Sequence, residues 1–190
     1  GKGEGIETGS GNPHNPDGVD TEYLWLDVLT IDSILQLVES FIFYEVDKSN
    51  SKKKTLIFPR YHQRRAVSRL LEDMKTNHTD NNYLIQHSAG SGKTNTIAWL
   101  AHSLVSLHDD QNRNIVDTVL IVTDRIVVDR QLQDAVRQIS HKSGVVKVMG
   151  DRETSSDLAD AIAGNTKIIE TTIHKFAQIN QSDWMSVGNT

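Results

Sequence analysis

The chain has 190 residues, 37% of them hydrophobic, which suits one domain with room for an appendage. It has no cysteine, which excludes disulfides and thiolate-bound zinc, and it has neither an apolar run of bilayer-spanning length nor a signal peptide. We therefore expect a cytoplasmic protein with no membrane partner. Because the chain begins with Gly1 rather than Met, we also expect a piece of something longer.

The net charge of −5 is distributed unevenly along the chain. Residues 1–47 hold ten acidic residues against Lys2 alone, whereas residues 48–75 hold nine basic residues against Glu72 and Asp73. The local surplus of positive charge could contact phosphates, as nucleic-acid-binding surfaces do. It fits a solvated linker and helix face equally well, so both interpretations stay open.

The first third of the chain predicts one helix between irregular stretches. Residues 1–20 are rich in Gly, Asn, Asp and Ser and predict an irregular segment. A helix with a broad apolar face is predicted over 31–43 by Ile31, Ile34, Leu35, Val38, Phe41 and Ile42. We place a boundary in the lysine-rich run 48–54. The expected organisation is an irregular segment (1–20), a linker helix with a basic connector (21–54), and a domain (55–190).

A second helix is predicted after Pro59, and it leads towards the most informative segment of the chain. Its apolar side consists of Ala66, Val67, Leu70, Leu71 and Met74. Arg64, Arg65 and Arg69 should be largely exposed. A polar loop (77–82) and a predicted strand at Tyr83-Leu84-Ile85 follow. Residues 87–94 then read His-Ser-Ala-Gly-Ser-Gly-Lys-Thr, and a periodic helix begins near Thr94.

Strand, glycine loop, Lys-Thr and helix form the arrangement of a phosphate-binding P-loop. Glycines let the chain bend tightly and turn backbone N–H groups inward, and the start of the following helix adds partial positive charge. Lys93 would reach the β- and γ-phosphates, and the Thr94 hydroxyl would hold Mg²⁺. The predicted nucleotide-binding residues are Gln63, Ser88, Ala89, Gly90, Ser91, Gly92, Lys93 and Thr94.

The octapeptide departs from the full P-loop pattern at one position, because His87 stands six residues before the lysine, where the pattern has glycine. The plain alternative is a glycine turn followed by an exposed Lys-Thr helix start. The predicted strand before the loop and the helix after it favour the P-loop interpretation.

The rest of the chain alternates apolar β-rich runs with helical patterns. Strands are predicted at 118–122, 145–148 and 167–172, with helices over 132–139 and 158–162 between them. This alternation predicts an α/β fold with a parallel sheet and right-handed crossovers. Function in such sheets gathers at the carboxyl ends of strands, where Asp124-Arg125 and Thr171-Thr172 fall.

Gln63 lies 30 residues before Lys93. Its amide offers one acceptor and two donors, which match the N6 and N7 atoms of adenine. An aromatic-x-Gln segment at this distance before a Gly-Ser-Gly-Lys-Thr loop resembles the adenine-recognising Q motif of superfamily 2 helicases. A surface glutamine on a helix is the plain alternative.

Several segments together resemble the motor (R) subunit of type I restriction enzymes. They are Arg60-Tyr61-His62-Gln63, the loop 87–94, Val122-Thr123-Asp124-Arg125 and Thr171-Thr172-Ile173-His174-Lys175-Phe176. The resemblance implies a parallel-sheet RecA-like P-loop lobe, incomplete here, of an ATP-dependent type I site-specific deoxyribonuclease. It implies translocation on double-stranded DNA before cleavage, with ATP and Mg²⁺ as cofactors and the modification and specificity subunits as partners.

The same resemblance implies that Arg125, Thr171 and Thr172 face the DNA backbone. For Arg125, an ion pair with Asp124 or Asp129 is the alternative.

Two motifs of that machinery are not found in this sequence. No acidic pair follows Thr172 to hold Mg²⁺ and orient water, since Asp183 is alone, and no Asp…Glu-x-Lys nuclease constellation is present. We expect the chain on its own to bind ATP weakly and not to hydrolyse it.

The eight histidines lack metal-binding spacing, and Trp25, Trp99 and Trp184 suit core or interface positions.

Three other functions share some of these features. Another superfamily 2 helicase or remodeller would have the same Q motif and P-loop. A nucleotide-binding scaffold module would bind without turnover, and a small-molecule kinase would need the P-loop but not Gln63.

Overall fold

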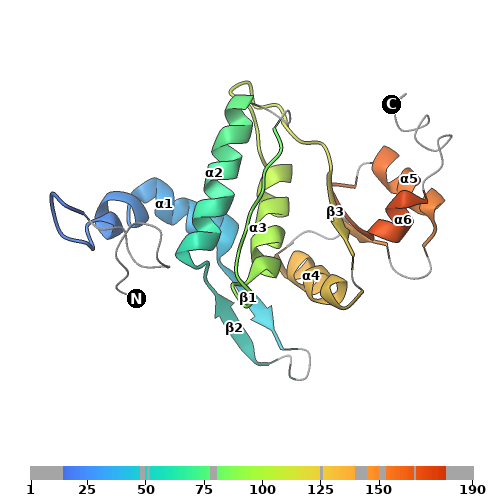
Figure 1. Cartoon of the computed structure of the whole chain (residues 1–190), viewed down its shortest axis with the longest axis horizontal. Coiled ribbons are helices and arrows are strands. Elements are labelled where there is room, and N and C mark those ends of the chain that lie inside the picture. Colours follow the sequence, from blue (N-terminus) through green and yellow to red (C-terminus); the bar gives the residue numbers. More distant parts are fainter. Residues whose placement is uncertain are drawn as a thin grey trace.

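In the computed structural model, residues 15–47, 50, 52–77, 81–124, 126–139, 145–149, 153–164 and 166–178 are described, with 126–130 described in their backbone only. A parallel sheet lies towards the carboxyl end of this chain (Figure 1). Its strands are β3 (Val119–Thr123), β4 (Val146–Val148) and β5 (Ile168–Thr172), in the order β3-β5-β4. Val119 pairs with Ile168 and Val146 also pairs with Ile168, so β5 is central. The predicted α/β class with a parallel sheet is confirmed.

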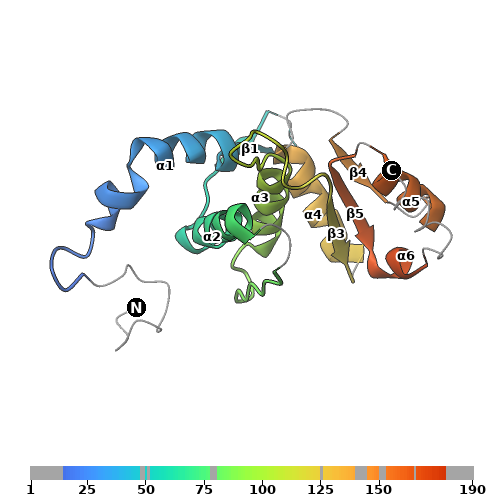
Figure 2. The same cartoon turned by 90° about the horizontal axis from the view of Figure 1, so that it is seen from above.

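Helices cover both faces of this sheet (Figure 2). Helix α4 (Ile126–Ile139) connects β3 to β4, α5 (Ser155–Ala163) connects β4 to β5, and α6 (Ile173–Ala177) follows β5. Neighbouring residues of a strand point to opposite faces. Accordingly, Ile168 enters the core beside α4, whereas Ile169 enters the core beside α5. This two-sided burial explains why two apolar residues, Ile168 and Ile169, stand next to each other in β5.

The helical patterns after the P-loop are confirmed. Leu132, Ala135 and Val136 of α4 are buried, as are Leu158 and Ala161 of α5. Thr154 and Asp157 form a capping box at the start of α5: each residue's side chain accepts a hydrogen bond from the other's backbone N–H. This bonding holds the pKa of the Asp157 carboxyl below its usual value.

A second core joins the amino-terminal half of the chain to helix α3 (Lys93–Val105). Trp99 of α3 is fully buried between Phe41 and Phe43, and its indole nitrogen donates to the Phe41 carbonyl oxygen at 2.9 Å. Leu37 and Val67 complete this core. Trp99 is therefore a core anchor, as the sequence predicts.

The predicted helix over 31–43 is helical to Phe41, as α1 (Ile31–Gln36) continuing into the π-helical segment η2 (Leu37–Phe41). A further π-helical turn, η1 (Leu24–Val28), precedes it. The broad apolar face predicted over 31–43 is not packed as a whole. Of that face only Phe41 is buried, and Ile42 is partly covered. Four other members of that face are exposed, namely Ile31, Ile34, Leu35 and Val38.

An antiparallel hairpin stands where the sequence predicts a connector. Strand β1 (Phe43–Val46) pairs with β2 (Lys54–Ile57), with Phe43 opposite Ile57 and Val46 opposite Lys54. Of the lysine-rich run, Lys52 and Lys53 directly precede β2 and Lys54 is its first residue. The predicted domain boundary at residue 54 stays a prediction. The backbone hydrogen bonds between β1 and β2 join the two sides of that boundary.

The strand predicted at Tyr83-Leu84-Ile85 is wrong. The chain between helix α2 (Tyr61–Asn77) and the glycine loop has no regular structure over residues 81–88, and Leu84 is 92% exposed. A three-residue run needs neighbouring strands for its N–H and C=O groups, and no described strand pairs with it. The segment is instead held by Asp73 of α2, which accepts hydrogen bonds from the Tyr83 hydroxyl (2.5 Å) and the Asn81 amide (3.1 Å).

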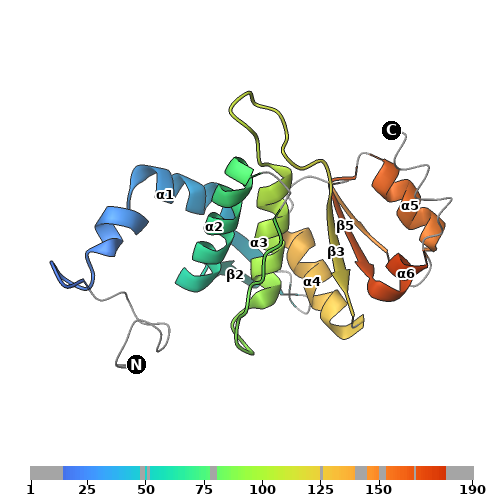
Figure 3. The ribbon, with the colours of Figure 1, turned by 45° about the horizontal axis from the view of Figure 1, so that its top comes forward.

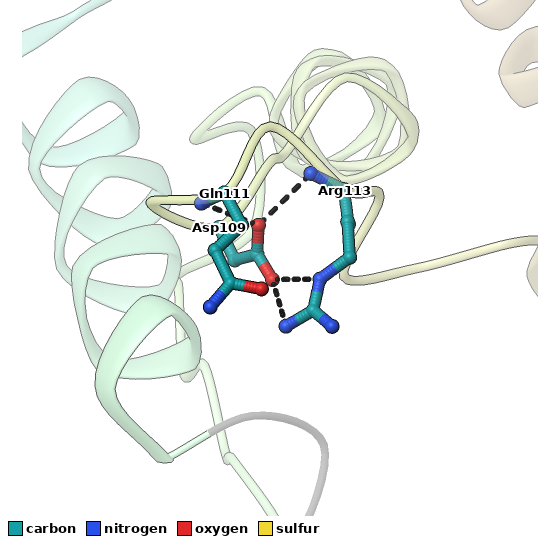
Figure 4. Close-up of polar contacts among 3 residues, drawn as sticks. All are labelled: Asp109, Gln111 and Arg113. Atoms are coloured by element: carbon teal, nitrogen blue, oxygen red, sulfur yellow. Dashed lines mark hydrogen bonds and ion pairs between the residues drawn. The ribbon is translucent and has the colours of Figure 1, made fainter.

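The predicted break after α3 is a loop organised by one carboxylate (Figure 4). Asp109 accepts hydrogen bonds from the backbone of Gln111 and Arg113, both at 2.9 Å, and pairs with the Arg113 guanidinium at 2.8 Å. These contacts hold the pKa of the Asp109 carboxyl below its usual value. The loop carries the chain from α3 to β3.

Across the described part of the chain, no helix combines the length and apolarity needed to cross a bilayer.

Candidate functional site

The glycine loop bends back on itself directly before α3. Gly90 and Gly92 have φ values of +72° and +83°, a region that residues with a Cβ rarely adopt. The Ser91 N–H donates to the Ser88 carbonyl oxygen at 3.3 Å, which closes the turn. Gly92 is the residue that caps α3. The positive φ values explain why glycine stands at both positions.

The loop presents most of its backbone to solvent, as an anion site requires. Ser88, Ala89, Gly90 and Gly92 are exposed, whereas Ser91 is buried and its hydroxyl has no hydrogen-bond partner in the described part of the chain. The start of α3 lies at the same place and contributes partial positive charge. An exposed bend of this kind at a helix start can accept a phosphate group.

Lys93, the first residue of α3, folds back over the loop. Its ammonium donates to the carbonyl oxygens of His87 (3.0 Å) and Ser88 (2.7 Å). A polyphosphate oxygen offers a stronger acceptor than a neutral carbonyl, so the same ammonium is placed to turn to an anion on the loop. Thr94 follows in the first helical turn and is half-buried. The residues present therefore fit a triphosphate with Mg²⁺.

A cavity of about 570 Å³ borders Thr94 on the side of the β1–β2 hairpin and α4. The carboxylates of Glu45, Asp47 and Asp134 line it, together with Lys53, which pairs with Asp47 at 3.5 Å. Three carboxylates disfavour a triphosphate in this cavity. An anion would therefore lie on the exposed side of the loop rather than in this cavity. Thr94 lies between the cavity and the exposed side of the loop.

Helix α2 begins against the loop, and Gln63 makes the join. Its amide nitrogen donates to the Gly92 carbonyl oxygen at 2.8 Å, and its amide oxygen accepts from the Arg60 N–H at 2.8 Å. Only 4% of Gln63 is exposed. As it lies, the side chain is committed at both ends within the protein. Because the side chain is buried, contact with adenine would require it to become accessible.

His62 and His87 also meet beneath the loop. The His62 Nε2 atom lies 3.1 Å from the Ser91 carbonyl oxygen, and the two imidazole rings meet edge to face with centroids 4.9 Å apart. Burial, followed by the positive charges that His62 and Lys93 can carry, lowers the pKa of His87. The sequence pattern identifies His87 as a departure from the P-loop pattern and His62 as part of the segment 60–63, but it does not predict that the two rings meet. The available signal was that His62 and Gln63 are consecutive polar residues at the start of an amphipathic helix.

The three predicted DNA contacts differ in what the structure shows of them. Arg125 lies outside the described residues. Thr171 is 1% exposed in the central strand, whereas Thr172 is half-buried at the start of α6. Of the two threonines, only Thr172 has appreciable solvent-exposed surface. In Figure 3 the segment before α3 and the carboxyl ends of β3 and β5 lie on the same, lower side, with α4 between them.

Comparison with known proteins decides the family. The profile of the SWI2/SNF2 ATPases matches residues 62–189, which begins at the helix that holds the glycine loop and includes the whole parallel sheet. The chain belongs to the SWI2/SNF2 ATPase family. Its α/β fold is that of a partial RecA-like domain, and ATP is the nucleotide that this family uses.

Two curated proteins of Methanocaldococcus jannaschii are similar to the chain. One, described as a putative type I restriction enzyme MjaVIIIP endonuclease subunit, is 30% identical over 146 residues, or 73% of this chain and 14% of that protein. The other, a putative type I restriction enzyme MjaVIIP endonuclease subunit, is 31% identical over 121 residues, or 60% of this chain and 11% of that protein. The chain thus spans a small part of these relatives. No solved structure gives a significant match.

Proposed function

We propose that the chain is the ATP-binding part of a type I restriction endonuclease motor subunit, which drives ATP-dependent translocation on double-stranded DNA before cleavage. The observation that carries the proposal is the exposed glycine bend before α3, with the Lys93 ammonium 2.7 Å and 3.0 Å from two of its carbonyl oxygens. The similarity to two restriction endonuclease subunits supports the restriction role. Modification and specificity subunits are the proposed partners, and the cytoplasm the proposed compartment.

Each residue of the loop has a part in this proposal. The backbone of Ser88, Ala89, Gly90, Ser91 and Gly92 lines the phosphates, Lys93 neutralises their charge, and Thr94 holds Mg²⁺. Mg²⁺, when bound there, would supply positive charge that offsets the negative charge of the phosphates. Gln63 selects adenine once its buried side chain becomes accessible.

DNA contact is proposed for Arg125 and for Thr171 and Thr172. Because Thr171 is buried, Thr172 is the more accessible of the two threonines. The basic segment before the loop adds exposed Arg65 and Arg69, whereas Arg64 is engaged with the Ser33 hydroxyl at 2.6 Å. Exposed guanidinium groups of this kind can follow a phosphate backbone.

A second candidate is another superfamily 2 remodelling ATPase, which the family match by itself also fits. Substrate tests separate the two, because the restriction motor needs its modification and specificity subunits to engage DNA. We further propose that the chain alone hydrolyses ATP inefficiently, since the sequence after Thr172 holds no acidic pair. Rapid turnover by this chain, abolished in Lys93→Ala, would refute that last point and also exclude a scaffold that only binds.

The test of nucleotide binding is the affinity of a non-hydrolysable ATP analogue with Mg²⁺, measured by calorimetry. Removing the Lys93 ammonium should weaken binding about tenfold or more, because a charge-assisted hydrogen bond contributes roughly 1.5–3 kcal/mol. Lys75→Ala is the matched control, since Lys75 is exposed at the far end of α2 and should change affinity less than about twofold. Equal affinity of the wild type and Lys93→Ala would refute the proposal.

A further inference from the structure

We propose that His62 is a positioning residue for the nucleotide loop: its imidazole holds the Ser91 carbonyl towards α2 and thereby aims the Gly92 N–H to the opposite side, where phosphate binds. This inference rests on the proposed ATP-binding function and extends it to a residue outside the loop.

The contact between His62 and the loop has a defined direction. The Nε2 atom lies 3.1 Å from the Ser91 carbonyl oxygen, 29 residues along the chain. A carbonyl oxygen only accepts hydrogen bonds, so Nε2 must carry the proton. The next side chain, Gln63, donates to the next carbonyl, that of Gly92, at 2.8 Å. Two consecutive side chains of α2 thus hold two consecutive carbonyls of the loop.

Peptide geometry turns these contacts into a constraint on the amide donors. In a planar trans peptide, the C=O bond and the following N–H bond point in opposite directions. Holding the Ser91 carbonyl towards His62 therefore points the Gly92 N–H away from α2. Gly92 has a φ of +83°, and glycine is free to adopt many backbone conformations. Without the contact to His62, the peptide between Ser91 and Gly92 could therefore adopt several orientations. Fixing its orientation before the ligand arrives lowers the entropic cost of binding.

His87 supports the orientation of the His62 ring. The two rings are nearly perpendicular, at 88°, with centroids 4.9 Å apart, which is a favoured edge-to-face arrangement. Burial lowers the pKa of His87 below its usual value. Glycine at this position would leave the His62 ring without that edge-to-face neighbour. The contact gives a reason for histidine where the full P-loop pattern has glycine.

The experiment compares two substitutions that separate the donor from the ring. His62→Phe keeps an aromatic ring without the N–H, whereas His62→Gln keeps an N–H at the reach of Nε2 without the ring. A fluorescent non-hydrolysable ATP analogue with Mg²⁺ is the probe, and thermal melting checks the fold of each variant. We expect the affinity to fall about fivefold or more in His62→Phe, as for the loss of one hydrogen bond, and to return to within about twofold of wild type in His62→Gln.

The outcomes separate this inference from the function on which it rests. Binding that depends on Lys93 but is unchanged in His62→Phe would overturn the positioning role alone. Binding that is indifferent to Lys93→Ala would overturn the nucleotide site itself. Since the phenylalanine variant could fold poorly, ¹⁵N NMR of the wild type gives a second measurement. We expect His62 to carry its proton on Nε2, and a tautomer protonated only on Nδ1 would contradict the proposal.

Discussion

The amide nitrogen of Gln63 donates a hydrogen bond to the carbonyl oxygen of Gly92 at 2.8 Å, which fastens the first turn of α2 to the last residue of the glycine loop. Gln63 is itself buried, and its side chain also accepts a hydrogen bond from the Arg60 N–H. The shape of the loop therefore depends on a helix that begins 32 residues before α3 does.

Gly92→Ala should destabilise the protein more than Gly90→Ala. A Cβ at either position meets a positive φ, which costs about 1–2 kcal/mol. At Gly92 the added atom would also lie 2.5 Å from the Gln63 amide nitrogen, whereas at Gly90 nothing lies within 4 Å. We expect the free energy of unfolding to fall by about 3 kcal/mol or more for Gly92→Ala, measured by urea denaturation. Equal losses in the two variants would show that Gln63 does not pack against Gly92.

Gln63→Ala should lower both stability and base selectivity. Truncation leaves the Arg60 N–H and the Gly92 carbonyl without this partner, which should cost roughly 1–3 kcal/mol in unfolding free energy. If Gln63 selects adenine, the preference of the wild type for ATP over GTP analogues should also shrink. A wild type that binds both analogues with equal affinity would remove Gln63 from base recognition and leave only its structural contact.

His87 should make stability depend on pH below neutrality. Its pKa in the folded protein lies below the ordinary value of 6.5, chiefly because of burial. As pH falls below 6.5, the unfolded chain therefore takes up a proton that the folded protein does not. Stability from this group is present above pH 6.5 and declines as pH falls towards the folded pKa. The difference in unfolding free energy between wild type and His87→Phe, followed from pH 7.5 to 5, should shift in this direction; a parallel pH dependence in both would contradict it.

Trp99→Phe should be costly, whereas Trp25→Phe should not. Trp99 is fully buried and its indole N–H reaches the Phe41 carbonyl, so the substitution leaves both a void and an unpaired acceptor. We expect a loss of about 1–3 kcal/mol in unfolding free energy. Trp25 is 51% exposed, and the same substitution there should stay within about 0.5 kcal/mol. Chemical denaturation of the two variants gives the comparison.

Elements whose burial follows a local period could be predicted from the sequence. The helical spacing of Leu132 and Val136 predicted α4, and the apolar run over 118–122 predicted β3. The glycine bend was predictable for the same reason, since positive φ is a local property of Gly90 and Gly92.

Contacts between distant segments were beyond local patterns. The pairing of β1 with β2 joins residues on either side of a lysine-rich stretch that has the composition of a linker. Tyr83-Leu84-Ile85 has strand composition, yet pairing depends on neighbours that its own residues do not specify. The bond from His62 to Ser91 likewise depends on how α2 lies against the loop, which the sequence interval alone does not specify.

Triphosphate binding by the backbone around Ser91 can be tested by an ¹H–¹⁵N NMR titration of the chain with a non-hydrolysable ATP analogue and Mg²⁺. We expect saturable shifts concentrated in the amides of residues 88–94, and their loss in Lys93→Ala. Saturable shifts elsewhere, or none at all, with the loop amides unmoved, would contradict it.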